Sequence, residues 1–225
     1  MSLEQRFEKL VIAEESGEDT ETASSGHRGR NRAVFIDRDG VINQDTKHTW
    51  KKDELRLFEG VGEAIMKFRK LSFKVIIATN QGGMAMGKYG KEEFASFMEE
   101  LRKRLDLENP WDMVYFSPFH STGEVEEYRC DHIDRKPGPG MLLRAALEHD
   151  IDLPTSYMVG DHLKDVSAAH RARCNAVLVL TGRGRSQLQR LIDEGIAPGD
   201  EKYPDHIVED LRTASELIEH LEGRI

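Results

Sequence analysis

Residues 32–41 read Arg-Ala-Val-Phe-Ile-Asp-Arg-Asp-Gly-Val, an apolar run that ends in two acids and a glycine. The run is short, β-branched and aromatic, which predicts a strand of a parallel sheet buried on both faces. Residues two apart on an extended chain point the same way, so Asp37 and Asp39 are expected side by side. Gly40 allows the chain to turn sharply after them.

The pattern of this first strand recurs along the chain and alternates with amphipathic segments. Helix periodicity is clearest at 61–71, where Val61, Ala64, Ile65 and Phe68 share one face. We expect an α/β fold with a three-layer, doubly wound, Rossmann-like parallel sheet and a minimal cap. The expected strands are 33–36, 74–78, 113–116, 157–159 and 176–180, and the expected helices are 61–71, 91–107, 140–149, 164–172 and 210–221.

Composition limits the classes of function. The 225 residues carry a net charge of −9, which disfavours binding to nucleic acid or to an anionic membrane. No apolar run is long enough to span a membrane, and two cysteines do not make a disulfide framework. We expect a cytoplasmic monomer with one domain at 31–225, preceded by a flexible acidic tail at 1–30.

Polar groups follow the other expected strands, where functional groups of a doubly wound sheet gather. Thr79, Asn80, Gln81 and Gly82 offer a hydroxyl, two amides and an approachable backbone, all suited to an oxyanion. Further along stand the following residues: Arg135, Lys136, Asp161 and Asp165. Crowded carboxylates call for a cation, and lysine and arginine can hold a phosphate, so a metal-assisted phosphate site is expected.

Two rival readings come from other motifs. The segment Gly82–Lys88 fits the Gly-x-x-x-x-Gly-Lys part of a nucleotide-binding P-loop, but Tyr89 stands where a metal-binding Ser or Thr is needed. Arg183-Gly184-Arg185 could touch nucleic acid, but it is interpreted as a solvated loop after the last strand.

The ordered motifs resemble those of the haloacid dehalogenase-like superfamily over residues 32–222. They are Asp37-Arg38-Asp39-Gly40-Val41, Thr79-Asn80, Lys136-Pro137, and Gly160-Asp161 followed by Asp165. Within it the chain looks most similar to heptose bisphosphate phosphatases and the related histidinol phosphatases. The resemblance implies a phosphoric monoester hydrolase whose substrate is a small phosphorylated metabolite. It favours a sugar bisphosphate, and the alternatives are histidinol phosphate, another small metabolite or a nucleotide.

The resemblance also implies roles for single residues. Asp37 would attack phosphorus and form an aspartyl-phosphate, and Asp39 would act as general acid and then base. Mg²⁺ would bind the Asp37 carboxylate, the Asp39 carbonyl and Asp161, while Thr79 and Lys136 would hold the phosphoryl oxygens. Substrate contacts are expected from Arg38, Asp45, Thr46, Lys47, His48, Asn80, Gln81, Gly82 and Arg135.

One loop departs from the family pattern. Relatives carry a structural zinc site with Cys-x-His and then Cys-x-Cys before the Arg-Lys pair. Here the four positions are occupied by Ser117, Phe119, His132 and Asp134. His120 and Cys130 could join His132 and Asp134 in some other site. We expect the loop to hold no zinc, and its role in choosing substrate to differ.

Overall fold

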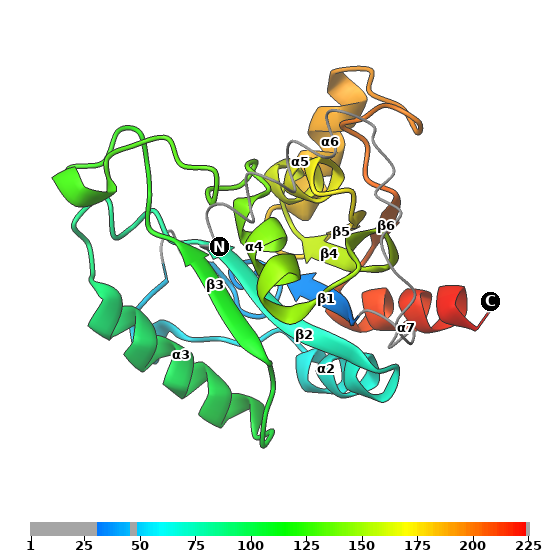
Figure 1. Ribbon diagram of the computed structural model, residues 1–225, viewed down its shortest axis with the longest axis horizontal. Coiled ribbons are helices and arrows are strands. Elements are labelled where there is room, and N and C mark those ends of the chain that lie inside the picture. The colour runs from blue at the N-terminus through cyan, green and yellow to red at the C-terminus, as the bar shows by residue number, and fades with distance from the viewer. Residues whose placement is uncertain (1–30, 46–48, 224–225) are drawn as a thin grey trace, which may run out of the picture.

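The chain forms a six-stranded parallel sheet with helices on both faces (Figure 1). This computed structural model describes residues 31–45 and 49–223. The expected tail at 1–30 lies outside the described residues, and the domain boundary at 31 stays a prediction. The α/β, doubly wound fold class is confirmed.

The strands are β1 (Arg32–Ile36), β2 (Phe73–Asn80), β3 (Met113–Ser117), β4 (Tyr157–Gly160), β5 (Asn175–Val179) and β6 (His206–Val208). The helices are α2 (Val61–Lys70), α3 (Lys91–Leu105), α4 (Gly140–His149), α5 (Leu163–Arg171), α6 (Gly184–Asp193) and α7 (Leu211–Glu222). Single-turn 3₁₀ helices lie at Lys52–Glu54, Glu126–Tyr128 and Leu153–Thr155. Strand order across the sheet is β3-β2-β1-β4-β5-β6, with every pair parallel.

The core is split by the sheet because side chains of β1 alternate between its faces. Val34 and Ile36 pack in the cluster with α2, α3 and α7, whereas Ala33 and Phe35 pack in the cluster with α4 and α5. All four are fully buried. Burying a side chain such as Phe35 contributes roughly 1.5–3 kcal/mol, so β1 anchors both layers.

Two elements at the C-terminal side differ from the expectation. The segment interpreted as a solvated loop, Arg183–Arg185, instead begins α6, and β6 adds a sixth strand. Only Gly184 and Leu191 of α6 are buried, and β6 is a three-residue edge strand of intermediate exposure. Neither segment therefore has the continuous apolar pattern that predicts a buried element.

The described connections around the sheet's carboxyl edge carry no folded cap. The segment between β1 and α2 and the segment between β3 and α4 each contain one single-turn 3₁₀ helix among their described residues. The edge of the sheet is therefore open to a substrate. No helix among the described residues has the length and apolarity needed to cross a membrane.

Candidate active site

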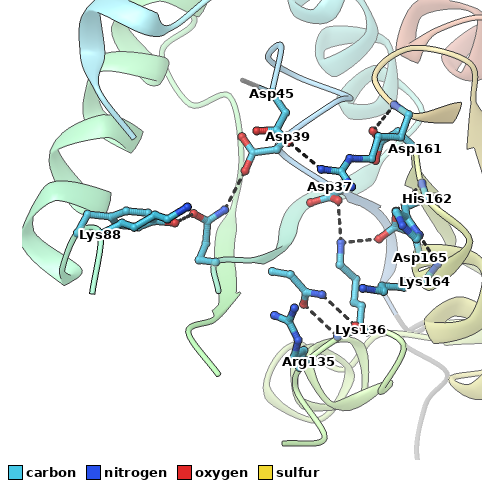
Figure 2. Close-up of a pocket in the computed structure, with 14 residues that line it drawn as sticks. Asp37, Asp39, Asp45, Lys88, Arg135, Lys136, Asp161, His162, Lys164 and Asp165 are labelled. Atoms are coloured by element: carbon cyan, nitrogen blue, oxygen red, sulfur yellow. Dashed lines mark hydrogen bonds and ion pairs between the residues drawn. The ribbon is translucent and has the colours of Figure 1, made fainter. Parts of the chain in front are cut away.

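The expected motifs meet at the point where the strand order reverses. The chain runs outward from β1 through β2 to β3, and then crosses back to place β4 on the other side of β1. Such a switch point opens a crevice at the carboxyl ends of the strands. A pocket of about 420 Å³ lies there, and Figure 2 shows residues from both halves of the sheet converging on it.

Asp37 and Lys136 form the centre of this pocket. Lys136 is 1% exposed, and its Nζ lies 3.1 Å from Asp37 Oδ2 and 2.6 Å from Asp165 Oδ1. The same Nζ donates to the Ala78 carbonyl at 2.8 Å, which anchors it to β2. Burial opposes the charge on Lys136, but Asp165 and Asp37 outweigh burial and raise its pKa. The ammonium therefore stays charged beside the nucleophile candidate.

Three carboxylates crowd the base of the pocket. Oxygens of Asp37, Asp161 and Asp165 lie within 4.8 Å of one another. Burial, followed by the charges of Asp37 and Asp165, raises the pKa of Asp161 to about 8. Burial also raises the pKa of Asp37 to about 6, against the opposing effect of Lys136. Ionised carboxylates this close repel one another. A hard divalent cation bound between them offsets that repulsion, so the group suits such a cation.

Glycines make this crowding possible. Gly40 has φ +88°, and a Cβ on it would lie 2.0 Å from Asp161 Oδ2. Gly182, with φ +52°, would place a Cβ 2.2 Å from the same oxygen. Both positions need the left-handed backbone and the missing side chain, so they fix Asp161 against the loop after β1. The Arg183 backbone N–H also donates to Asp161 Oδ2 at 2.8 Å.

Asp39 lies in a separate hydrogen-bond network. Arg38 donates to it from Nε at 3.0 Å and from Nη2 at 2.6 Å. Asn43 Nδ2 and Gln81 Nε2 add further bonds at 2.9 and 3.1 Å. The Asp39 side chain is thus held apart from the three-carboxylate group, which leaves only its backbone carbonyl for the metal role that the resemblance implies.

Arg38 lies against aromatic side chains of α3. It was predicted to contact substrate, but it is fully buried and its guanidinium lies 4.6 Å from the Phe97 ring centre. Its Nη2 also donates to the Thr49 carbonyl at 2.8 Å. Arg38 is not among the residues that line the pocket, and its side chain positions Asp39. Its contact with substrate stays a prediction.

The residues after β2 connect the two networks. Gln81 Nε2 donates to Thr79 Oγ1 at 3.0 Å, and Tyr89 donates to Gln81 Oε1 at 2.6 Å. Asn80 holds the Lys136 backbone at both of its polar groups, at 2.9 and 3.0 Å. Thr79 is 1% exposed and is not among the residues that line the pocket. Its contact with a phosphoryl oxygen stays a prediction.

The remaining substrate predictions divide by location. Asp45, Asn80, Gln81 and Arg135 line the pocket, and Gly82 lies against the Arg135 guanidinium. Thr46, Lys47 and His48 lie outside the described residues. The Gly82–Lys88 segment forms a series of turns, with α3 beginning at Lys91, and it brings Lys88 to the same pocket.

Sequence reasoning missed several pocket residues. Lys88, Tyr89, His162, Lys164 and Arg183 line it without having been predicted to take part. Position after a strand could have indicated His162 and Lys164, since both follow Asp161 at the end of β4. The position of Arg183 could be predicted only with β5 and α6 placed correctly, because this residue is the N-cap of α6.

The four positions that carry zinc ligands in the relatives make other contacts in this chain. The Phe119 and His132 rings stack with centres 4.0 Å apart, and Arg144 Nη1 donates to Asp134 Oδ2 at 2.7 Å. Ser117 is fully buried in β3. In the described part of the chain, the acidic group at the pocket is the one set of three or more close metal-binding side chains. That the loop binds no zinc stays a prediction.

An open parallel α/β sheet with a buried lysine and clustered carboxylates at its switch point defines a phosphoryl-transfer site of the haloacid dehalogenase-like class. Residues 133–214 match the HAD-hydrolase-like family model. The chain is 41% identical over 155 residues to the D-glycero-β-D-manno-heptose-1,7-bisphosphate 7-phosphatase of Escherichia coli, covering 67% of this chain and 80% of that one. It is 36% identical over 191 residues to the Thermosynechococcus vestitus D-glycero-D-manno-heptose-1,7-bisphosphate 7-phosphatase, covering 83% and 94%.

Solved structures agree with these relatives. A D,D-heptose 1,7-bisphosphate phosphatase from B. bronchiseptica, complexed with magnesium and phosphate, matches with a TM-score of 0.71 and 30% identity over 84% of this chain and 99% of that one. A HAD-like phosphatase from Mesorhizobium loti has a TM-score of 0.71 and 28% identity, over 90% and 91%. The chain belongs to the heptose bisphosphate phosphatase family of the haloacid dehalogenase-like superfamily, and it is a phosphoric monoester hydrolase.

Proposed function

We propose that this phosphatase removes the 7-phosphate of D-glycero-D-manno-heptose 1,7-bisphosphate, with Asp37 as nucleophile and Mg²⁺ as cofactor. The observation that supports it is the Asp37 carboxylate placed 3.1 Å from a buried Lys136 ammonium at the base of an open pocket. The substrate comes from the relatives, which carry that name at 36–41% identity. Two free cysteines suit the cytoplasm, where thiols stay reduced.

The chemistry proceeds in two steps. An Asp37 oxygen attacks phosphorus and forms an aspartyl-phosphate, and the bond from phosphorus to the sugar oxygen breaks. Asp39 gives its proton to that departing oxygen. In the second step Asp39 takes a proton from water, whose oxygen attacks phosphorus and breaks the bond to Asp37. Phosphate leaves, and both carboxyl groups return to their starting states.

Other side chains hold and position the reacting groups. Lys136 keeps Asp37 ionised, because its charge opposes the effect of burial on the Asp37 pKa. Asp37 and Asp161 fit a divalent cation, with the Asp39 carbonyl as a further ligand and Asp165 holding Lys136. When bound, Mg²⁺ would neutralise charge on the phosphoryl oxygens. Arg38 and Gln81 fix the direction of the Asp39 carboxyl.

Replacing the nucleophile tests the assignment. Asp37→Asn keeps the size of the side chain and removes the attacking oxygen, so turnover of p-nitrophenyl phosphate and heptose bisphosphate with Mg²⁺ should disappear. Asp193→Asn, on the exposed end of α6, is the matched control and should keep wild-type rates. Substantial turnover in a folded Asp37→Asn variant would refute the covalent route.

Substrate choice needs its own assay. Values of kcat/KM are compared for heptose 1,7-bisphosphate, fructose 1,6-bisphosphate, histidinol phosphate and a nucleoside monophosphate. We expect heptose bisphosphate to rank first. A different compound in first place would replace the proposed substrate while leaving the Asp37 chemistry intact.

A further inference from the structure

Tyr89 lines the pocket, but the proposed reaction does not use it. It follows the turns of Gly82–Lys88 and precedes α3. Tyr89 is 8% exposed, and its hydroxyl donates to Gln81 Oε1 at 2.6 Å. Gln81 in turn donates from Nε2 to Asp39 Oδ2 at 3.1 Å. A chain of two hydrogen bonds therefore runs from Tyr89 to the proposed general acid (Figure 2).

The Tyr89 ring is held in place by two neighbours. A Cβ on Gly83 would lie 2.3 Å from Tyr89 Cε1, so the ring occupies space that a glycine leaves free. Trp50 stacks on the ring, with the ring centres 5.8 Å apart and the planes at 23° to each other. Burial raises the pKa of the Tyr89 hydroxyl, which therefore stays protonated and able to donate. A donor held in this way fixes the group that accepts from it.

The hydrogen bond from Tyr89 decides which end of the Gln81 amide faces Asp39. Nε2 carries two protons, and it donates to Asp39 Oδ2 and, at 3.0 Å, to Thr79 Oγ1. Oε1 can only accept, and it accepts from Tyr89. Gln81 is 1% exposed, so an amide group left without a partner there is costly. The observed direction gives each end of the amide a partner of the opposite kind.

The direction of this amide matters because Asp39 gives its proton to the departing sugar oxygen. A reversed amide would place Oε1 against Asp39, where it would accept that proton in a hydrogen bond and hold it away from the leaving group. An N–H group facing Asp39 cannot accept the proton, which stays available to the substrate. The same N–H group stabilises the negative charge that develops on Asp39 as the proton leaves.

We propose that Tyr89 is a positioning residue for the general acid, and that it acts by fixing the direction of the Gln81 amide. This inference rests on the proposed function. It also gives a role to the segment that matched part of a nucleotide-binding P-loop. In that motif Tyr89 stands where a metal-binding hydroxyl is needed, whereas in this fold its hydroxyl serves Asp39.

Tyr89→Phe tests the proposal because it removes one oxygen atom and keeps the stacked ring. The variant should lose about tenfold in kcat/KM for heptose 1,7-bisphosphate, which corresponds to about 1.4 kcal/mol. The loss for p-nitrophenyl phosphate should be less than about twofold, since its leaving group needs little help from an acid. KM for heptose bisphosphate should stay near the wild-type value, because the lost interaction acts in the transition state.

A double-mutant cycle with Gln81 separates positioning from a structural role. Gln81→Met keeps the length of the side chain and removes the amide, so adding Tyr89→Phe should cause no further loss in kcat/KM. A structural role for the hydroxyl would give additive losses that are equal for both substrates. Direct contact between the hydroxyl and the sugar would raise KM and leave kcat unchanged. Either of these results would overturn the proposal.

Tyr157→Phe is the matched control. Its hydroxyl donates to Glu222 Oε1 at 3.3 Å, and Tyr157 begins β4, at the end of the strand opposite the pocket. This variant should keep the wild-type ratio of kcat/KM for heptose bisphosphate to that for p-nitrophenyl phosphate.

Failure of the positioning role can be told from failure of the proposed function. If Tyr89→Phe keeps the wild-type ratio while Asp37→Asn loses all turnover, the positioning role is wrong and the phosphatase chemistry stands. If Asp37→Asn keeps its activity, the proposed function fails whatever Tyr89→Phe shows. A tenfold fall confined to the sugar substrate, absent in the Gln81→Met background, supports both.

Discussion

Replacing Lys136 by methionine should destabilise the protein by an amount that depends on pH. The substitution keeps the length of the side chain and removes its charge. Three contacts disappear, to the Asp37 and Asp165 carboxylates and to the Ala78 carbonyl. Because Lys136 is 1% exposed, water does not readily replace it, and the two acids are left unpaired.

The magnitude follows from the cost of an unpaired buried charge. Removing one partner of a buried pair costs about 3–5 kcal/mol. Lys136 is the largest influence that lowers the pKa of Asp37, so this pKa should rise above about 6 in the variant. A carboxyl whose folded pKa is raised loses stability as pH increases from its unfolded value through the folded one. The penalty should therefore be full at pH 8 and smaller at pH 5, where Asp37 can take up a proton.

Urea unfolding without metal at the two pH values measures this difference. With an m-value of about 3 kcal/mol/M, the midpoint should fall by roughly 1–2 M at pH 8 and by clearly less at pH 5. Lys70→Met removes an exposed lysine and should change neither midpoint. With Mg²⁺ present, kcat should fall by roughly 10²–10³ as a phosphoryl-binding charge is lost. Equal midpoint shifts at both pH values would refute the electrostatic explanation.

Three further predictions follow from the site. Asp39→Ala should lower kcat/KM by roughly 10²–10⁴ for heptose bisphosphate and by less for p-nitrophenyl phosphate, whose leaving group needs little acid help; equal losses would argue against the acid role. Gly160→Ala places a Cβ 2.3 Å from the Asp165 Cβ, so urea unfolding should show a loss of about 1–3 kcal/mol, and an unchanged midpoint would contradict that clash. Since the pKa of Asp161 is raised to about 8 without metal, the metal-free protein should lose stability as pH rises from about 4 to 8, and Mg²⁺ should raise the melting temperature more at pH 8 than at pH 5. A Mg²⁺ shift that is larger at pH 5 would have the wrong sign.

The sequence predicted the central sheet because its strands have strong local patterns. Residues 33–36 are wholly apolar and fully buried, and the polar groups after each strand had to meet once the strands were parallel. Asp37, Lys136 and Asp161 could therefore be placed together from their positions in the chain alone.

Contacts between segments could not be predicted in the same way. Arg38 follows the nucleophile and looks like a ligand group, but Phe94 and Phe97 of α3 enclose it from another part of the chain. Lys164 and Arg183 read as ordinary surface cations until β4 and β5 bring them to the pocket. Only Gly184 and Leu191 of α6 are buried and β6 has three residues, so neither segment has the apolar run that made the other elements predictable.

The position of β1 in the middle of the sheet has a consequence for how the protein folds. The Ala33 N–H donates to Ser156 Oγ across a separation of 123 residues, and β1 pairs with β4 beside it. Asp161 and Asp165 join Asp37 only when this distant pairing forms, and such non-local contacts form slowly. A chain that has folded only through β3 has Asp37 in place but lacks Asp161, the second carboxylate proposed to bind the metal. Metal affinity should therefore appear late in refolding, as a reporter of the pairing between β1 and β4.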